Sequence, residues 1–384
     1  MFSFTKKGIR FKKYTPSELA IRRVMPKQIT LPVGELFLMP GDRVFGAKAI
    51  STLDGREVAA PCNGRFVGVQ SVKTANGNIS CAVILPDAQE PMTFAYNSID
   101  MPNMEQLLQA AEKIAPILPE LPPLAARLQG LSAQPVAIRA VDDGPDRAAA
   151  NAVLCGYLKE IVSAVGWLER SGADVTLYTN NLNVKSYVQD RATDVTIRSV
   201  SGKYPSDVWL KQRLAKAPAI VLDVREVYAL FHTIAYGCPP PGTVVTVCVW
   251  GKALQAVEVP IGTPASAVFD ALAPDMRLIA NGVLCGTAVL PETPITPTLD
   301  ALTLLFPVSA RASTCMACGQ CVRHCPMGLS PYLCNQQAAH ASAHTARQYG
   351  ADRCIACGAC DYVCPSKLPL RQMMVNFAEV EQHA

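Results

Sequence analysis

The sequence lacks any long apolar segment and carries little charge. Of its 384 residues, 50% are hydrophobic and 17% are charged, yet no run reaches the roughly 18–20 uninterrupted apolar residues of a membrane-spanning helix. The richest stretch, residues 278–290, is broken by Asn281, Gly282 and Gly286. We therefore expect no membrane span, and enough apolar material for the cores of roughly two to four domains.

Targeting and nucleic-acid signals are also missing. The basic N-terminal segment is followed by no apolar h-region, so we expect no signal peptide and a cytoplasmic protein. The net charge of +4 is concentrated in residues 6–27, which hold eight lysines and arginines and one acid, Glu18. This arm is either solvated or contacts an anionic membrane surface or an acidic partner. No nucleic-acid-binding module accompanies the charge, so we expect no nucleic-acid partner.

Loops that bind nucleotide phosphates are absent, since the sequence contains neither GxGxxG nor GxxxxGK[ST]. Asp142-Asp143-Gly144-Pro145-Asp146 follows the first strand expected in the central region. Acidic side chains stabilise a helix N-terminus but repel a phosphate there, which disfavours a nucleotide at this strand end. His324, His340 and His344 are expected on the surface, because the i, i+4 pair His340/His344 lacks the acid of HExxH.

Eight of the 15 cysteines form two copies of C-x2-C-x2-C-x3-C-P near the C-terminus. This spacing lets three thiolates of one copy hold a 4Fe–4S cluster while the fourth reaches across to a second cluster. We assign to cluster 1 the residues Cys315, Cys318, Cys321 and Cys364. We assign to cluster 2 the residues Cys354, Cys357, Cys360 and Cys325. The sequence therefore predicts an electron-transfer protein, in which the amides of Gly319 and Gly358 can hydrogen-bond cluster sulfurs.

Other uses of these cysteines fit the pattern less well. A zinc ribbon needs two CxxC pairs, which leaves the third and fourth cysteine of each copy unexplained. Disulfides are not expected in the reducing compartment of a chain without a secretory signal. The remaining cysteines stand singly among apolar neighbours and are expected to be structural: Cys62, Cys81, Cys155, Cys238, Cys248, Cys285 and Cys334.

The N-terminal part of the chain predicts short strands and then a connector. Residues 29–87 have turns at Pro40-Gly41-Asp42 and at Asn63-Gly64, the latter a hairpin signal, and suit a small barrel-like sandwich. Carrier proteins place a lysine at the tip of such a sandwich, where this sequence has Asn63, so we expect a structural role. The proline-rich residues 88–135 predict a short helix and an extended connector.

The central part predicts two further units. Residues 136–236 alternate β-branched strands with amphipathic helices, which indicates a largely parallel, Rossmann-like α/β core. Its expected strands are 136–141, 175–178, 195–200 and 220–224, and its expected helices are 147–170, 183–191, 207–216 and 226–236. Residues 237–306 form an α+β unit of β-grasp size. Its expected elements are a hairpin of 244–249 and 257–261 around Trp250-Gly251-Lys252, a helix at 265–272, and strands at 278–280 and 302–306.

Both cysteine runs, Cys315–Leu329 and Cys354–Leu370, are close to one family form, and six other segments are similar to that family. They are Gly8-Ile9, Pro40–Val44 with Pro61–Gly64, Lys203-Tyr204-Pro205, Thr243–Val247 and Pro260–Pro264. Over nearly its whole length the chain resembles the RnfC/RsxC family of the Rnf ion-translocating electron-transport complex. The resemblance implies a multidomain α/β and α+β fold. Its parts are a basic arm (1–28), a barrel-sandwich hybrid domain (29–87), a linker (88–135), the α/β core (136–236), a soluble-ligand-binding β-grasp (SLBB) unit (237–306) and a dicluster ferredoxin domain (307–384).

The chain departs from the family at one place. Members with NADH activity carry a Gly-Gly-Ala-Gly-Phe-Pro-type loop for flavin and nucleotide, and then a Glu-Cys-Glu-Pro-type segment. Here the corresponding stretch is the proline-rich linker, which runs directly to Arg139–Pro145. We therefore expect two 4Fe–4S clusters but neither FMN nor NADH, and we predict no catalytic residue.

The predicted function is an iron–sulfur subunit that relays electrons between a soluble donor or acceptor and a membrane or flavoprotein partner. It is an electron-transfer component of an oxidoreductase complex, of the translocase type if it is an Rnf subunit. Its partners would be other subunits, a ferredoxin or a flavoprotein, at the cytoplasmic face of the inner membrane. Two alternatives stay open: an oxidoreductase with its own flavin or corrinoid, similar to the cobalamin reductases of diol-metabolising microcompartments, and an interaction scaffold with structural clusters.

Overall fold

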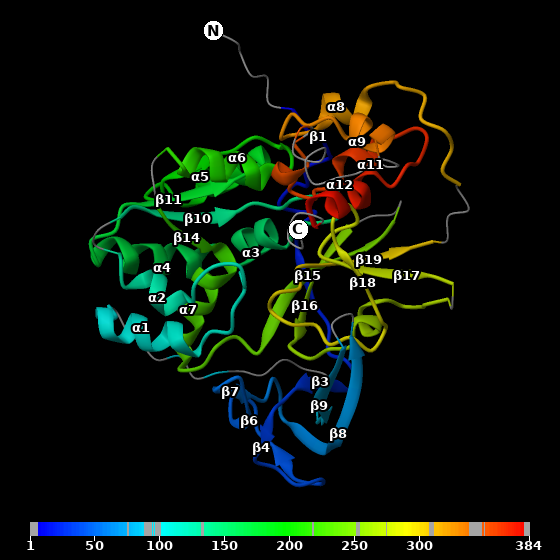
Figure 1. The fold of residues 1–384 in the computed structure, drawn as a ribbon. Helices are drawn as coiled ribbons and strands as arrows, with labels where there is room; N and C mark the ends of the chain where they lie inside the picture. The colour runs from blue at the N-terminus through cyan, green and yellow to red at the C-terminus, as the bar shows by residue number, and fades with distance from the viewer. Residues whose placement is uncertain are drawn as a thin grey trace.

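A computed structural model describes most of the chain (Figure 1). The described residues are 7–74, 77–87, 94, 96, 101–131, 134–216, 219–250, 254–273, 275–306, 311–337, 348 and 350–379. The central sheet and the helices that cover it lie on one side of the molecule. The early strands gather at one end, and the cysteine-bearing segment lies at the other end. Within the described ranges, no helix combines the length and the apolar character that a bilayer crossing requires.

The early strands form two small antiparallel sheets around one apolar core that includes Phe66 and Ile84. The first sheet has the order β3-β9-β8-β5, formed by Ile29–Pro32, Gly77–Pro86, Gly64–Thr74 and Arg43–Val44. The second has the order β4-β6-β7, formed by Glu35–Leu36, Ala49–Leu53 and Arg56–Ala59. Short strands that pack two layers on a shared core agree with the turn signals of the sequence.

The predicted hairpin turn at Asn63-Gly64 is wrong. Strand β8 begins at Gly64 and pairs with β9, so the chain reverses between Thr74 and Gly77 instead. The Asn63 Oδ1 accepts a hydrogen bond from the Gly46 N–H (2.8 Å), which ties two loops together. A Cβ at Gly64 would lie 2.4 Å from the Leu85 carbonyl oxygen, so the close approach of strands, and not a turn, requires glycine there.

The proline-rich segment contains two short helices, α1 (Met104–Lys113) and α2 (Leu124–Leu128). Helix α1 confirms the predicted short helix, and it starts at a capping box in which Asn103 and Gln106 exchange hydrogen bonds (2.9 Å each). The segment is not simply extended, because Leu107 and Leu128 are fully buried in the core of the neighbouring α/β unit. Apolar residues at helical spacing, and not the prolines, therefore decide how this part packs.

The α/β core has four parallel strands in the order β12-β11-β10-β14. The strands are β10 (Val136–Ala140), β11 (Val175–Thr179), β12 (Ile197–Ser199) and β14 (Ile220–Asp223). The helices are α3 (Ala149–Gly156), α4 (Leu158–Arg170), α5 (Leu182–Arg191), α6 (Ser206–Leu214) and α7 (Val224–Tyr236). The predicted parallel sheet is confirmed. The single helix expected at 147–170 is divided at Tyr157 (φ −123°, ψ 36°), next to Gly156, whose Cβ would lie 2.6 Å from Ile21.

The next unit is a six-stranded mixed sheet in the order β18-β17-β19-β15-β16-β2. Its strands are β15 (Gly242–Val249), β16 (Leu254–Pro260), β17 (Arg277–Ala280), β18 (Thr287–Val289), β19 (Ala301–Leu305) and β2 (Ile21–Arg23). The β15–β16 hairpin is confirmed, although Gly251 and Lys252 of its predicted turn lie outside the described residues. The helix expected at 265–272 is only one 3-10 turn, η1 (Ala265–Val268), because Phe269 returns to extended backbone.

The backbone of the basic N-terminal arm is tied onto two sheets, while six of its basic residues stay exposed: Lys7, Arg10, Lys12, Arg22, Arg23 and Lys27. Strand β1 (Ile9–Arg10) pairs with β13 (Lys203–Tyr204), and β2 pairs with β16. Leu19, between β1 and β2, is 1% exposed and belongs to the α/β core. Two of the cations are also paired internally: Lys12 with Glu18 (2.6 Å) and Arg23 with Glu258 (2.7 Å).

The C-terminal segment consists of short helices separated by loops. They are α8 (Gln320–His324), α9 (Pro331–Gln337), η3 (Ala351–Arg353), α11 (Ala359–Tyr362) and α12 (Leu370–Glu379). The segment rests on the rest of the molecule near β1 (Figure 1), where Ala359 shares an apolar cluster with Ile9 and Tyr204. The structure is thus a mixed α/β protein with a helical, cysteine-bearing C-terminal part.

Candidate iron–sulfur sites

The two cysteine runs fold alike. In each, the alanine after the motif's second residue has a left-handed backbone, with φ 52° at Ala317 and 51° at Ala356. A glycine with φ 70° (Gly319) or 73° (Gly358) then starts a short helix, α8 or α11. Left-handed alanine is a costly backbone state, and it recurs at equivalent positions of both loops. The repeat in sequence is therefore a repeat in structure.

The cysteines gather around two small cavities. One is lined by Cys315, Cys318, Cys321 and Cys364. The other is lined by Cys325, Cys354, Cys357 and Cys360. Each cavity receives three cysteines from one run and the fourth from the other run. The fold thus brings together the same two sets of four cysteines that were assigned to cluster 1 and cluster 2 from the spacing.

The donor set suits an iron–sulfur cluster. Four thiols converge on each cavity, and cysteine thiolates are the usual ligands of 4Fe–4S clusters. The other walls are largely apolar, with Met327 and Leu329 beside one cavity and Tyr332 and Leu368 beside the other. In such a cluster each thiolate binds a different iron, so the four sulfurs surround a volume. Among the described residues, no group of three or more His, Cys, Asp or Glu is arranged for a single metal ion.

Burial shapes the chemistry of these thiols. Desolvation raises the pKa of Cys357 to about 11 and also raises the pKa of Cys321, Cys354 and Cys360. Ligand binding requires thiolates, so cluster assembly must release these protons. Backbone amides approach two sulfurs: Leu329 N lies 3.3 Å from Cys325 Sγ and Ala356 N lies 3.4 Å from Cys354 Sγ. Such amides stabilise negative charge on cluster ligands.

The two glycines expected beside the clusters have different surroundings. Gly319 and Gly358 both line their cavities. A Cβ at Gly358 would lie 2.0 Å from the Leu284 carbonyl oxygen, whereas a Cβ at Gly319 would meet nothing closer than Arg323 Nη1 at 3.9 Å. Glycine at 358 is therefore required by packing against the loop between β17 and β18, in addition to its left-handed backbone.

Two side chains hold the second run on the body of the protein. The Tyr204 hydroxyl donates a hydrogen bond to the Cys357 carbonyl oxygen. The Arg371 guanidinium donates to the Ala356 carbonyl (2.8 Å) and to the Cys285 carbonyl (3.1 Å). Sequence reasoning missed both roles. The only signal was the Lys203-Tyr204-Pro205 motif, which carries no information on its distant partner in the chain.

The other cysteines of the described residues belong to neither group of four. Cys334 is 1% exposed, lies in the apolar cluster that contains Cys325, and has a pKa raised by burial to about 11. Cys62, Cys81 and Cys248 are buried, and Cys155, Cys238 and Cys285 are half-buried. His324 contacts the Gln320 carbonyl of its own helix (3.0 Å). His340 and His344 lie outside the described residues.

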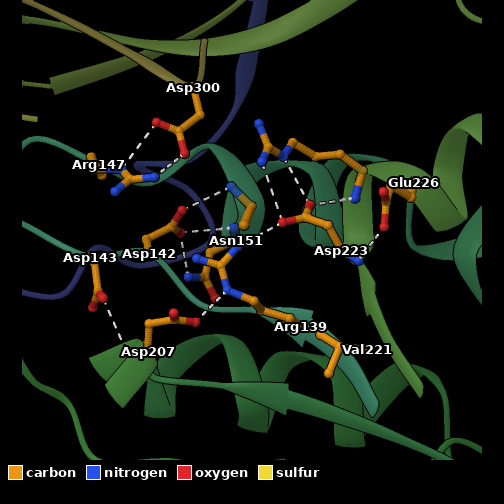
Figure 2. A network of polar contacts seen from close by, with 12 residues as sticks. Arg139, Asp142, Asp143, Arg147, Asn151, Asp207, Val221, Asp223, Glu226 and Asp300 are labelled. Carbon is orange, nitrogen blue, oxygen red and sulfur yellow. Dashed lines mark hydrogen bonds and ion pairs between the residues drawn. The ribbon is translucent and has the colours of Figure 1, made fainter. Parts of the chain in front are cut away.

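The carboxyl edge of the parallel sheet is the place where α/β folds bind ligands, and here it is filled by the chain's own acids (Figure 2). The buried Asp142 carboxylate accepts hydrogen bonds from the Ala150 and Asn151 amides (2.9 Å each) at the start of α3. The Asp143 carboxylate accepts from the Ser206 (2.5 Å) and Asp207 (3.0 Å) amides at the start of α6. Amides that could bind a phosphate are thus already occupied.

Arginines neutralise the same edge. Arg139 bridges Asp207 (2.8 Å) and Asp223 (2.9 Å), and Figure 2 shows it between them. Burial opposes ionisation of Asp223, but Arg225 and Arg139 outweigh it and hold its pKa below the usual value. From the N-terminal arm, Lys13 is near Asp142 and Asp143; burial lowers its pKa, and both carboxylates oppose that effect. The edge is a closed network of compensating charges.

A third cavity, of about 350 Å³, lies where α4, α7 and β16 meet. Tyr157 and Tyr228 stack in its wall with ring centroids 4.1 Å apart, beside His232 and the Arg23–Glu258 ion pair. Its size falls in the range of small-molecule sites. It is the place where a ligand of the alternative oxidoreductase function could bind.

Comparison with known proteins defines the class. A family model described as a 4Fe–4S dicluster domain matches residues 307–365. The C-terminal part of the chain is therefore a 4Fe–4S dicluster domain.

Its curated homologues share one name, that of the C subunit of an ion-translocating oxidoreductase complex. The chain is 36% identical to the Rhodobacter capsulatus protein over 163 residues, which are 40% of this chain and 31% of the relative. It is 25% identical to the Vibrio cholerae protein over 380 residues, covering 84% of this chain and 48% of the relative. The predicted resemblance to RnfC is thus confirmed. The chain spans less than half the length of either relative.

Two solved structures are distantly similar. Both are chains of NAD+-reducing [NiFe]-hydrogenase, in the air-oxidised and the H2-reduced state, at 14% and 12% identity. The alignments cover 73% and 72% of this chain and 54% and 60% of the other chain, with TM-scores of 0.38 and 0.41. Scores this low do not establish a shared fold.

Proposed function

We propose that this protein relays electrons through two 4Fe–4S clusters, between a soluble donor or acceptor and a membrane or flavoprotein partner. The observation that carries the proposal is the pair of cavities, each lined by four cysteines of which three come from one run and one from the other. Cluster 1 would bind to Cys315, Cys318, Cys321 and Cys364, and cluster 2 to Cys354, Cys357, Cys360 and Cys325. A 4Fe–4S cluster, when bound, takes up and releases one electron at a time.

The chain's own residues position these ligands. Because each run contributes to both cavities, neither cluster loop can be displaced without disturbing the other. Tyr204 and Arg371 fix the carbonyls of Cys357 and Ala356, which lie in the loop of cluster 2. The Leu329 and Ala356 amides approach sulfurs of the same cluster. These contacts are the means by which the protein would orient the ligands and adjust a cluster's potential.

The proposal includes neither FMN nor NADH. In its support, the amides at the starts of α3 and α6 are occupied by Asp142 and Asp143. A phosphate at this edge would have to displace a buried carboxylate from these amides. Binding of a flavin or a dinucleotide at the usual edge of the sheet would therefore cost several hydrogen bonds of the folded protein.

We also propose the finer division of the chain and its place in a complex. The units are the basic arm (1–28), the hybrid domain (29–87), the linker (88–135), the α/β core (136–236), the SLBB-like β-grasp (237–306) and the ferredoxin-type domain (307–384). Apolar clusters in the first sheets and in the mixed sheet support these two units, whereas Leu19 of the arm and Leu107 of the linker pack into the core of the α/β unit. The relatives are named as subunits of a complex. Partner subunits at the cytoplasmic face of the inner membrane are the corresponding proposal for this chain.

Anaerobic purification with iron, sulfide and flavin determination tests the function. We expect about eight irons and eight sulfides per chain, no flavin, and an EPR signal of two interacting centres after reduction with dithionite. About four irons in fully loaded protein would contradict the two-cluster proposal. Stoichiometric FMN or corrinoid would instead support the alternative oxidoreductase. Clusters that dithionite does not reduce would favour the interaction scaffold.

The variant Cys334→Ala is a matched control for the ligand cysteines. Cys334 is buried beside Cys325 in the same apolar cluster, yet it lies in neither group of four. We expect this variant to keep about eight irons, whereas Cys325→Ala should lose about half of them. Equal iron loss in the two variants would show that packing, and not ligation, controls cluster content.

A further inference from the structure

The two cluster sites differ in how much of them reaches solvent. Equivalent positions of the two runs make the comparison direct. Cys318 is exposed, whereas its counterpart Cys357 is half-buried and its carbonyl is bonded to Tyr204. Gly319 has open space where Gly358 meets Leu284. At the second ligand and the glycine after it, the second run is therefore the inner site and the first run the outer site, whereas at the third ligand Cys321 is buried and Cys360 half-buried.

The outer site has an apolar centre. Met316, directly after the first ligand cysteine, is 62% exposed, and it also lines the cavity of the first group of cysteines. A methionine side chain is flexible and polarisable, which suits a surface that is covered only transiently. An exposed methionine two residues before the exposed ligand Cys318 offers a short path between solvent and the cluster 1 site.

Exposed cations lie on the loops of this site. Arg311, Arg323 and Lys367 are exposed, and residues 311–337 contain no aspartate or glutamate. The Ser313 amide donates to the Ser366 carbonyl (2.9 Å), which places Arg311 and Lys367 on connected loops. The Arg323 guanidinium donates to the Cys318 carbonyl (2.9 Å), so one positive charge lies at the ligand loop itself.

We propose that this surface, the cluster 1 face formed by Met316, Cys318, Arg311, Arg323 and Lys367, docks an acidic one-electron carrier protein. The inference rests on the proposed function and adds which cluster exchanges electrons with the partner and what charge the partner carries. Transient electron-transfer interfaces are small, and charge complementarity steers their encounter. Three exposed cations on the loops that also bear an exposed methionine and a redox ligand match an acidic carrier and would repel a basic one.

Binding of the oxidised carrier to the loaded protein tests the proposal without any turnover. The probes are an acidic 2Fe–2S ferredoxin and, as the carrier of opposite charge, cytochrome c, each titrated by calorimetry at low and at high salt. We expect the ferredoxin to bind and its affinity to fall as salt rises, because exposed charges are screened within about 10 Å at 0.1 M. Cytochrome c should not bind measurably.

Charge reversal at the surface gives the decisive comparison. Arg311→Glu should weaken ferredoxin binding at low salt by about fivefold or more. Arg56→Glu is the matched control: Arg56 is exposed at the start of β7, at the opposite end of the molecule from the C-terminal helices (Figure 1), and the charge change is the same. It should change the affinity less than twofold. Met316→Gln should weaken binding about threefold at both salt concentrations, since it removes apolar contact.

Each failure is distinguishable. If the two charge reversals act equally, or if vesicles containing phosphatidylserine bind the face and ferredoxin does not, the docking proposal is overturned while the clusters stand. If the protein does not contain about eight irons, the proposed function fails, and the docking inference fails with it.

Discussion

The dicluster domain and the carboxyl edge of the parallel sheet handle their polar groups in opposite ways. At the sheet edge, buried carboxylates receive hydrogen bonds from helix amides and ion pairs from arginines, so the fold satisfies itself. In the C-terminal part, four thiols converge on each of two cavities, and burial raises the pKa of Cys321, Cys354, Cys357 and Cys360. The thiols around the two cavities are therefore available to bind a cofactor. The carboxylates at the sheet edge are bound by other groups of the protein, apart from the Oδ1 atom of Asp146.

The largest effect should come from opening the closed edge. Asp142→Ala removes a buried carboxylate that accepts from the Ala150 and Asn151 amides. Because two helix donors then remain buried without acceptors, we expect a loss of about 2–4 kcal/mol in the free energy of unfolding. Denaturant unfolding followed by tryptophan fluorescence measures this. Asp174→Ala, at an exposed aspartate before β11, is the control and should cost under about 0.5 kcal/mol. Similar losses in both variants would mean that the edge is not a stabilising network.

A smaller effect concerns Asp146, where the closed network is incomplete. Its Oδ2 accepts from Val283 N (2.9 Å) and Thr303 Oγ1 (2.6 Å), but its buried Oδ1 has no partner among the described residues. Burial raises the pKa of this carboxyl despite those hydrogen bonds. The folded state therefore holds the proton more tightly than the unfolded state, so stability falls as pH rises from about 4 towards the raised pKa.

Asp146→Asn removes this titration and keeps the acceptor at Oδ2. The variant should therefore lose less stability than the wild type as pH rises from 5 to 8. Unfolding curves at both pH values provide the measurement. If the two proteins show the same pH dependence, Asp146 is ionised in the folded protein and the orphan oxygen has another explanation.

The smallest effect tests the link between the body and the inner site. Tyr204→Phe removes the hydroxyl that donates to the Cys357 carbonyl. Since such a bond stabilises added negative charge near the cluster, its loss should lower the potential of cluster 2 by a few tens of millivolts. Potentiometric titration followed by EPR should show no change at cluster 1. Tyr362→Phe, at a 46% exposed tyrosine of α11, is the control. A shift of both potentials, or of neither, would contradict a specific role for Tyr204.

Much of the fold could be predicted from local patterns. The alternation of strands and helices indicated the parallel sheet, because each buried strand is a short β-branched run and each helix carries its own apolar face. Three cysteines of each group followed from spacing, since a short loop brings them together, and the fourth followed from the exchange of ligands that this motif shows in two-cluster ferredoxins. The absence of a phosphate loop and the acids after β10 pointed to the edge that Asp142 and Asp143 fill.

What could not be predicted depends on contacts between distant segments. Nothing local shows that the basic arm pairs through Ile9–Arg10 and Ile21–Arg23 with strands about 200 residues away. The prediction of a hairpin turn at Asn63-Gly64 was wrong because the Asn63 side chain instead accepts a hydrogen bond from the Gly46 amide. The contact of Gly358 with Leu284, and of Tyr204 with Cys357, is visible only once the C-terminal part lies on the body.

The exchange of the fourth ligand between the two runs is the central claim, and the variant Cys364→Ala tests it most directly. Iron determination and EPR on this variant should show the loss of one cluster, and the remaining signal should match that of Cys315→Ala, although Cys364 belongs to the other run. A remaining signal that matches Cys354→Ala instead would show that each run binds its own cluster, which contradicts the account.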